Sequence, residues 1–248
     1  MGTNIYTEPA LYDAVNWWKN NDIQFITDMA DEIGGSVLEL AAGTGRLAIE
    51  IMDKGQSYLG VDSSQEYVEY ANQKIKSKGF DGRVILGDMH TFSLPNTYDF
   101  IFIGFNSFFH LLTNDDALAC LTQAYTHLSN QGKFVIDLFI PDPSFLYKDE
   151  NKLYHVTNFT WPEDGSKGMV KERNHYNDET QINHIWWYFY KENMDDPSLF
   201  EFDMHMIYPD TMDRLLTEAG FTIEKKYGNH DKTPFNEESD YQIYVCGK

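Results

Sequence analysis

A glycine loop between a buried strand and a helix constrains the fold of this chain more than any other feature. The stretch SVLELAAGTGRLAIEIM begins at Ser36 with an apolar run typical of a short buried strand and ends with apolar residues spaced as on a helix face. Gly43 and Gly45 lie between them, where glycine lets a ligand approach the main chain. The N–H groups that begin the helix favour an anionic group there. The loop predicts an α/β fold with a ligand near its backbone, and an ordinary tight connection is the alternative.

Strand and helix patterns then alternate as far as residue 140. Strand patterns recur at 57–61 and 83–89, within 98–111, and at 132–139. They lack polar alternation, as strands covered on both faces do, so we expect a doubly wound parallel sheet with ligands at the carboxyl ends of its strands. Asn114 is placed to cap the helix before the last of these strands.

The pattern changes after residue 140. Segments such as QINHIWWYFY and LFEFDMHMIY alternate with turn signals, which predicts an antiparallel β insert at 141–208. Helical spacing and two strand patterns return at 209–248, and we expect these two strands to pair antiparallel at one edge of the sheet. Residues 36–140 and 209–248 are therefore predicted to form one core.

Composition excludes several classes of protein. The chain has 39 acidic and 19 basic residues and a formal charge of −20, which would repel a phosphate backbone, so nucleic acid is not an expected partner. Its 2 cysteines, Cys120 and Cys246, indicate neither a disulfide framework nor a metal site, and they fit a reducing cytoplasm. We expect no membrane association, because no apolar run approaches the ~20 residues needed to cross a bilayer and no secretory signal is recognisable.

Acidic residues at the ends of the predicted strands indicate the ligand. Asp62 ends the second strand, where its carboxylate can accept hydrogen bonds from both ribose hydroxyls of NAD or of an adenosine cofactor. Asp88 ends the third strand and can bind an adenine amino group, with Met89 packed on the ring. Glu39 would repel a pyrophosphate but can hold an ammonium group. The expected ligand is a zwitterionic adenosine compound and not a dinucleotide.

Four motifs in this order make the chain similar to the class I S-adenosylmethionine-dependent methyltransferases. They are ELAAGTG, VDSS, GDM and GFNSFFHL, in which Ala41 replaces the usual first glycine. The resemblance implies S-adenosylmethionine as cofactor, a Rossmann-like, mostly parallel seven-stranded sheet, and an N-terminal helical lid at residues 1–35. It also implies the following contacts: Glu39, Ala41, Gly43 and Gly45 with the methionine part, Asp62 and Ser63 with ribose, Asp88 and Met89 with adenine, and Phe105 and Asn106 beneath the sulfonium. Strand-end packing is the alternative role for Met89 and Phe105.

Methyl transfer is an in-line displacement in which positioning and exclusion of water matter more than a strong base. His110 and Tyr12 are the predicted catalytic residues, because His110 follows the fourth strand and Tyr12 lies in the expected lid. A structural histidine is the alternative for His110. Tyr6, in the same N-terminal segment, is predicted to contact the substrate.

A looser resemblance links the chain to small-molecule N-methyltransferases, including those that act on amino sugars. It implies a small acceptor, most simply an amine, although oxygen is not excluded. The segment NSFF also departs from the Asn-Pro-Pro-aromatic motif of enzymes that methylate DNA bases or glutamine amides. The alternatives are a non-catalytic regulator that binds S-adenosylmethionine and, ranked last, an NAD-dependent oxidoreductase.

The strand pattern HIWWYFY has apolar residues on both faces. Ile185, Trp187 and Phe189 share one face, and Trp186 and Tyr188 lie on the other. One face can pack within its own domain, and the other needs a cover. We expect Trp186 and Tyr188 to contact the substrate in the roof of the acceptor pocket, with a homodimer interface as the alternative.

Overall fold

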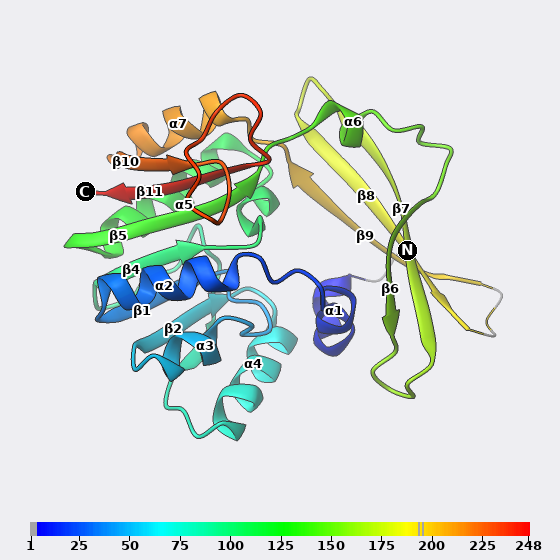
Figure 1. The fold of residues 1–248 in the computed structure, drawn as a ribbon, viewed down its shortest axis with the longest axis horizontal. Coiled ribbons are helices and arrows are strands. Elements are labelled where there is room, and N and C mark those ends of the chain that lie inside the picture. Colours follow the sequence, from blue (N-terminus) through cyan, green and yellow to red (C-terminus); the bar gives the residue numbers. More distant parts are fainter. Residues whose placement is uncertain (1–3, 193, 195) are drawn as a thin grey trace. The chain divides into compact units, whose positions relative to one another are not determined.

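The computed structural model describes residues 4–192, 194 and 196–248, which form two compact units (Figure 1). The core unit consists of Asn21–Ile140 and Ile207–Lys248. The insert unit consists of the described residues up to Asn20 together with Pro141–Met206. The N-terminal segment predicted as one lid is therefore divided between the two units after Asn20.

A seven-stranded sheet forms the centre of the core unit, in the order β10-β11-β5-β4-β1-β2-β3. Strands β1 to β5 are parallel, whereas β11 is antiparallel to both β5 and β10. The mostly parallel sheet of seven strands and the antiparallel pairing of the last two strands are confirmed. The strands are β1 Ser36–Leu40, β2 Ser57–Asp62, β3 Arg83–Leu86, β4 Tyr98–Ile103, β5 Leu128–Phe139, β10 Thr222–Tyr227 and β11 Tyr241–Gly247.

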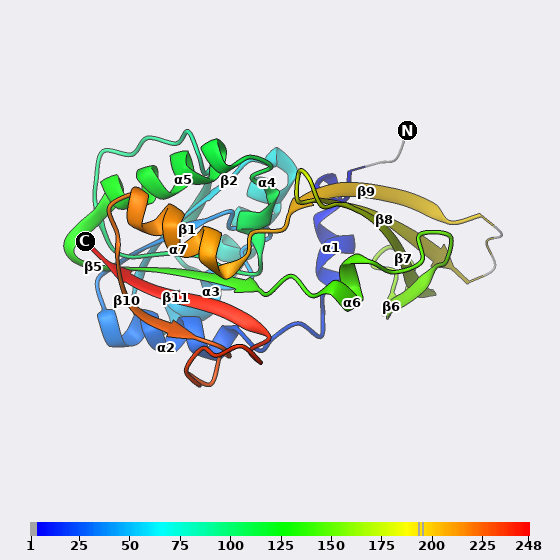
Figure 2. The same ribbon diagram turned by 90° about the horizontal axis from the view of Figure 1, so that it is seen from above.

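Helices cover both faces of this sheet. Figure 2 shows α2 and α3 on one side and α5 and α7 on the other. The helices of the core unit are α2 Ile23–Ile33, α3 Ala48–Asp53, α4 Gln65–Ser77, α5 Asn114–His127 and α7 Pro209–Glu218, and a 3-10 turn, η2, spans Ser107–His110. Thr113, and not Asn114, caps α5, because the Thr113 hydroxyl accepts the Asp116 N–H at 3.1 Å and Asn114 is already helical.

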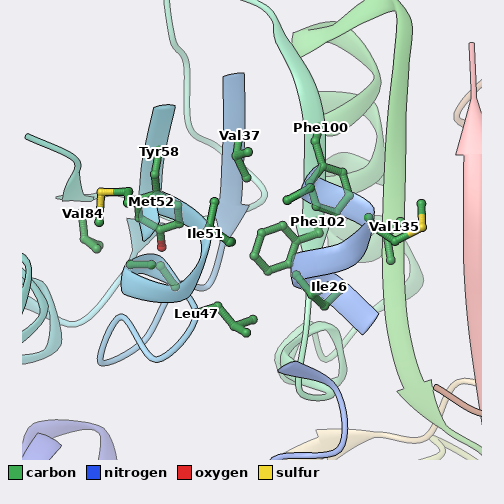
Figure 3. Close-up of a cluster of buried hydrophobic side chains, with 14 of the residues drawn as sticks. Ile26, Val37, Leu47, Ile51, Met52, Tyr58, Val84, Phe100, Phe102 and Val135 are labelled. Carbon is green, nitrogen blue, oxygen red and sulfur yellow. The ribbon is translucent and has the colours of Figure 1, made fainter. Parts of the chain in front are cut away.

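A large apolar cluster joins the strands to α2, α3 and α4. Figure 3 shows the part between α2, α3 and the strands, where Phe100 and Phe102 of β4 stack at 5.3 Å between ring centroids. The labelled members are Ile26, Val37, Leu47, Ile51, Met52, Tyr58, Val84, Phe100, Phe102 and Val135. Burying this much apolar surface fixes the sheet, and with it the loops at the carboxyl ends of the strands.

The insert unit is a four-stranded antiparallel sheet with short helical segments on one face. The strand order is β6-β7-β8-β9, so the predicted antiparallel insert is confirmed. Its elements are η1 Ile5–Thr7, α1 Pro9–Val15, α6 Pro143–Leu146, β6 Tyr154–Thr160, β7 Lys167–Asn177, β8 Ile182–Lys191 and β9 Ser198–His205.

The two faces of β8 differ as its sequence predicts. Ile185, Trp187 and Phe189 are buried, and they pack in one cluster with Ile5 and Leu11 of the N-terminal segment. The residues between them are half-buried on the opposite face. The N-terminal helical segments therefore cover the first face only. No helix among the described residues is long and apolar enough to span a membrane.

Candidate functional site

The glycine loop begins with strained backbone directly after β1. Ala41 has a φ of +57°, in the left-handed region that disfavours a side chain, and Gly45 has a φ of +69°. A Cβ on Gly45 would lie 3.1 Å from Ala71 Cβ of α4. Glycine at position 45 thus serves both the backbone angle and the close approach of α4 to the loop. At position 41, where the motif usually has glycine, a glycine would adopt this φ without strain, whereas Ala41 adopts it with its side chain.

Asp62 ties this loop to the end of β2. Its Oδ2 accepts the Gly43 N–H at 2.7 Å, and its Oδ1 accepts the Ser64 N–H at 2.9 Å. Burial raises the pKa of the Asp62 carboxyl, and the hydrogen bonds from Ser64 and Gly43 oppose that rise. Each carboxylate oxygen keeps lone-pair capacity for a further donor, as contact with two ribose hydroxyls requires.

Glu39 lies in β1 and forms a buried pair with Tyr58 of β2. Tyr58 Oη donates to Glu39 Oε2 at 2.5 Å, and Glu39 is 6% exposed. Burial raises the pKa of Glu39 to about 8, against the lowering effect of the Tyr58 hydrogen bond. Burial therefore favours the protonated form of Glu39 near neutral pH. A cation placed beside it would favour its ionised form.

This pKa makes the stability of the protein depend on pH. Because the folded-state pKa of Glu39 lies above its ordinary value of 4.5, the stabilising contribution of its proton is complete below pH 4.5 and lost as pH rises through 8. The free energy of unfolding should fall more between pH 5 and pH 8 in the parent protein than in Glu39→Gln, by on the order of 3 kcal/mol. Urea unfolding at the two pH values measures this difference. Equal falls in both proteins would contradict it.

A cavity of about 330 Å³ opens at the carboxyl ends of the strands beside these residues. Six of the sequence-predicted residues line it: Ala41, Asp62, Ser63, Asp88, Met89 and His110. Glu39, Gly43, Gly45, Phe105 and Asn106 are not among its lining residues. Gly43 nevertheless contacts the lining through its hydrogen bond to Asp62.

Six further residues line the cavity that were not predicted to contact a ligand, although three of them stand in the quoted motifs: Val61, Gly87, His90, Leu111, Leu112 and Asp116. His90 had a usable signal, because it follows Asp88 by two residues; its N–H donates to Asp88 Oδ1 at 3.1 Å. Asp116 lies in the first turn of α5, where an acidic side chain stabilises the helix through its dipole, so its presence there did not indicate a ligand site. The leucines carried no signal distinct from core packing.

Phe105 and Asn106 lie in the turn that follows β4, beside the end of β5. Both have positive φ, +57° and +61°, which is uncommon for residues with side chains. Asn106 Oδ1 accepts the Phe139 N–H at 2.7 Å, which fixes the turn after β4. The guanidinium of Arg46 lies 4.9 Å from the centroid of the Phe105 ring. Their predicted place beneath a sulfonium stays a prediction.

Arg46 was also missed, although it directly follows Gly45. Its guanidinium donates to both carboxylate oxygens of Asp22, at 2.8 and 2.5 Å, and the Asp22 side chain is buried. This bidentate pair holds the glycine loop to the start of α2. Asp22 precedes the first strand by fourteen residues, so no short motif connects it with Arg46.

The predicted substrate residues of the insert unit lie on opposite faces of its sheet. Tyr6 is 6.2 Å from Tyr12 and 6.2 Å from Phe202 between ring centroids, on the face covered by α1. Trp186 and Tyr188 lie on the other face, where the Arg173 guanidinium is 4.3 and 6.0 Å from their ring centroids. Within the insert unit the sheet thus separates the two pairs. A pocket roof formed by Trp186 and Tyr188 stays a prediction.

Residues 37–132 match the family model described as a methyltransferase domain. The match and the seven-stranded sheet confirm the predicted S-adenosylmethionine-dependent methyltransferase domain, which the family model places at residues 37–132. Asp62 lines the cavity and can accept further hydrogen bonds, whereas the predicted contacts of Glu39 with the ammonium group and of Asp62 with the ribose stay predictions.

The chain is similar to N-methyltransferases along nearly its whole length. It is 24% identical to a glycine/sarcosine N-methyltransferase of Aphanothece halophytica, over 95% of this chain and 86% of that protein. It is 27% identical to a glycine/sarcosine/dimethylglycine N-methyltransferase of Actinopolyspora halophila, over 95% of this chain but 40% of that protein.

Solved structures share the fold. The CcbJ methyltransferase from Streptomyces caelestis superposes with a TM-score of 0.82 at 21% identity and covers 98% of both chains. The amino pentose methyltransferase CalS10 from Micromonospora echinaspora, solved with bound S-adenosylmethionine, has a TM-score of 0.72 at 15% identity, over 99% of this chain and 97% of that chain.

Proposed function

We propose that the protein transfers the methyl group of S-adenosylmethionine to the nitrogen of a small amine. The observation that carries the cofactor part is the Asp62 carboxylate, which binds the glycine loop through Gly43 and lines the cavity at the strand ends. The amine is supported by similarity to glycine and sarcosine N-methyltransferases over 95% of the chain, a span that includes the insert. The formal charge of −20 is also compatible with a cationic small molecule.

The proposed cofactor contacts follow from this arrangement. The loop from Ala41 to Gly45, with Glu39 behind it, holds the methionine part; Asp62 and Ser63 hold the ribose; Asp88 and Met89 hold the adenine. The bound cofactor supplies a methyl group made electrophilic by the sulfonium. The protein then needs to hold an unprotonated amine in line with that methyl group and to exclude water.

We assign His110 to cofactor binding and orientation, because it lines the same cavity as Asp62 and Asp88. His110→Ala should raise the KM for S-adenosylmethionine several-fold and lower kcat by less than about tenfold, since positioning supplies most of the acceleration. Steady-state kinetics across pH measures both effects. His155→Ala, an exposed change in the insert unit, is the control. A thousandfold fall in kcat, together with loss of the lower limb of the pH profile, would instead assign general-base catalysis to His110.

The acceptor atom is tested with matched pairs of acceptors. Glycine is compared with glycolate, and an amino sugar with the same sugar bearing a hydroxyl in place of the amine. S-adenosylmethionine labelled in the methyl group is supplied, and both S-adenosylhomocysteine and the labelled product are measured by mass spectrometry. We expect transfer to the amines only. Transfer to the hydroxyl compounds only would overturn the amine assignment. Cofactor binding without turnover on a broad set of amines would favour the alternative of a non-catalytic regulator that binds S-adenosylmethionine.

A further inference from the structure

A lysine of the insert unit lies in a small aromatic site with one carboxylate. Lys148 Nζ is 5.0 Å from the centroid of the Phe145 ring and 5.0 Å from that of Tyr154. It is 3.9 Å from Glu172 Oε1, which exceeds hydrogen-bond distance. The cation is thus held by ring faces and by charge attraction at a distance, a geometry that does not depend on N–H donors.

The carboxylate of this site is held in place from the other side. Trp187 Nε1 donates to Glu172 Oε2 at 2.9 Å, and Glu172 is 9% exposed. Because a buried carboxylate is costly without a cation beside it, the site favours a positive group near Oε1. The Lys148 side chain is 28% exposed, so it is partly in contact with solvent.

An aromatic row continues from this site along the same face of the sheet. The ring centroids of Trp187 and Phe202 are 5.2 Å apart, and Tyr6 lies 6.2 Å from Phe202. Tyr12 lies 6.2 Å beyond Tyr6. The carboxylate and the two tyrosines predicted from the sequence as substrate and catalytic residues are therefore linked by contacts on one face within the insert unit.

We propose that Glu172, Phe145 and Tyr154 form a binding site for a methylated ammonium group, and that Lys148 fills this site as a displaceable internal ligand. A methylated ammonium group has few or no N–H groups to donate. It therefore fits a site made of aromatic ring faces and a carboxylate beyond hydrogen-bond distance better than a site whose oxygen atoms require hydrogen-bond donors. This inference rests on the proposed function in one respect: an amine methyltransferase must hold such a group in its product or in a partly methylated acceptor.

The probe is tetramethylammonium chloride, titrated calorimetrically without S-adenosylmethionine and against sodium chloride of equal concentration. Lys148→Ala removes the internal ligand and should bind the probe at least tenfold more tightly than the parent. Lys152→Ala removes a lysine of the same loop that pairs with Asp149 outside the site, and it should match the parent. In Lys148→Ala combined with Glu172→Gln the gain should vanish. Gln keeps an oxygen that can accept from Trp187 Nε1, so the sheet is preserved.

The proposal is overturned if Lys148→Ala binds the probe no more tightly than the parent, or if the double variant keeps the gain. Circular dichroism verifies the fold of each variant, and Lys148→Gln replaces Lys148→Ala in the comparison should the latter not fold. Failure of methyl transfer to amines would remove the proposed function without affecting this titration. Failure of the titration would leave methyl transfer untouched.

Discussion

Asp62→Ala is expected to weaken the binding of S-adenosylmethionine by about 2 to 4 kcal/mol, which is roughly 30- to 1000-fold in Kd. The carboxylate can accept both ribose hydroxyls, and the change removes those charge-assisted hydrogen bonds. It also releases the N–H groups of Gly43 and Ser64, which the carboxylate now holds. The loop that receives the methionine part should therefore lose order as well, and titration calorimetry should find the loss toward the upper end of the range.

Asp99→Ala is the matched control for this experiment. Asp99 accepts hydrogen bonds from the N–H and the hydroxyl of Ser36, both at 2.9 Å, at the amino end of β1. Removing the Asp99 carboxylate also frees a backbone donor, but at the amino ends of the strands, opposite to the cavity at their carboxyl ends. Cofactor affinity should be nearly unchanged in Asp99→Ala. If a folded Asp62→Ala protein bound S-adenosylmethionine as tightly as the parent does, the ribose contact would be excluded. Tight NAD binding by the parent would contradict the choice of cofactor.

Gly45→Ala is expected to destabilise the protein by about 2 to 4 kcal/mol and to impair cofactor binding. The new Cβ would meet the left-handed backbone strain and would crowd Ala71 Cβ at 3.1 Å. Gly79→Ala, at the end of α4, shares the first effect alone, because the φ of Gly79 is +80° and nothing lies within 4 Å of an added Cβ. Gly79→Ala should cost only about 1 kcal/mol and leave cofactor affinity intact.

Urea unfolding of the two glycine variants separates backbone strain from crowding. The difference between their unfolding free energies is the cost of pressing the loop against α4. Equal destabilisation in both variants would show that position 45 needs glycine for its backbone angle alone. Retained cofactor affinity in Gly45→Ala would contradict the view that the close packing of loop and helix forms the site.

Residues at the carboxyl ends of strands could be placed from the sequence, because a strand followed by a loop and a helix is a local pattern. Ala41, Asp62 and Asp88 line one cavity for this reason. The lateral partners could not be found in the same way. Tyr58 meets Glu39 only because β2 lies beside β1, and Arg46 meets Asp22 only because α2 packs against the loop. Such contacts depend on strand order and helix packing, which no short motif records.

The insert illustrates the same limit. Alternation along β8 predicted which residues share a face, and burial confirms that Ile185, Trp187 and Phe189 lie together. Alternation could not predict which face the N-terminal segment covers. The structure puts Tyr6 and Tyr12 with the buried face, and it reveals the Glu172 and Lys148 pair there, two residues that carried no sequence signal.

Hydrogen–deuterium exchange with and without S-adenosylmethionine tests most directly whether this cavity is the cofactor site. Four segments should exchange more slowly when the cofactor saturates the protein: 41–47, 61–66, 87–92 and 110–116. The slowing should be lost in Asp62→Ala at the same cofactor concentration. Unchanged exchange in all four segments of the parent protein at saturating cofactor, or slowing confined to other parts of the chain, would contradict the assignment.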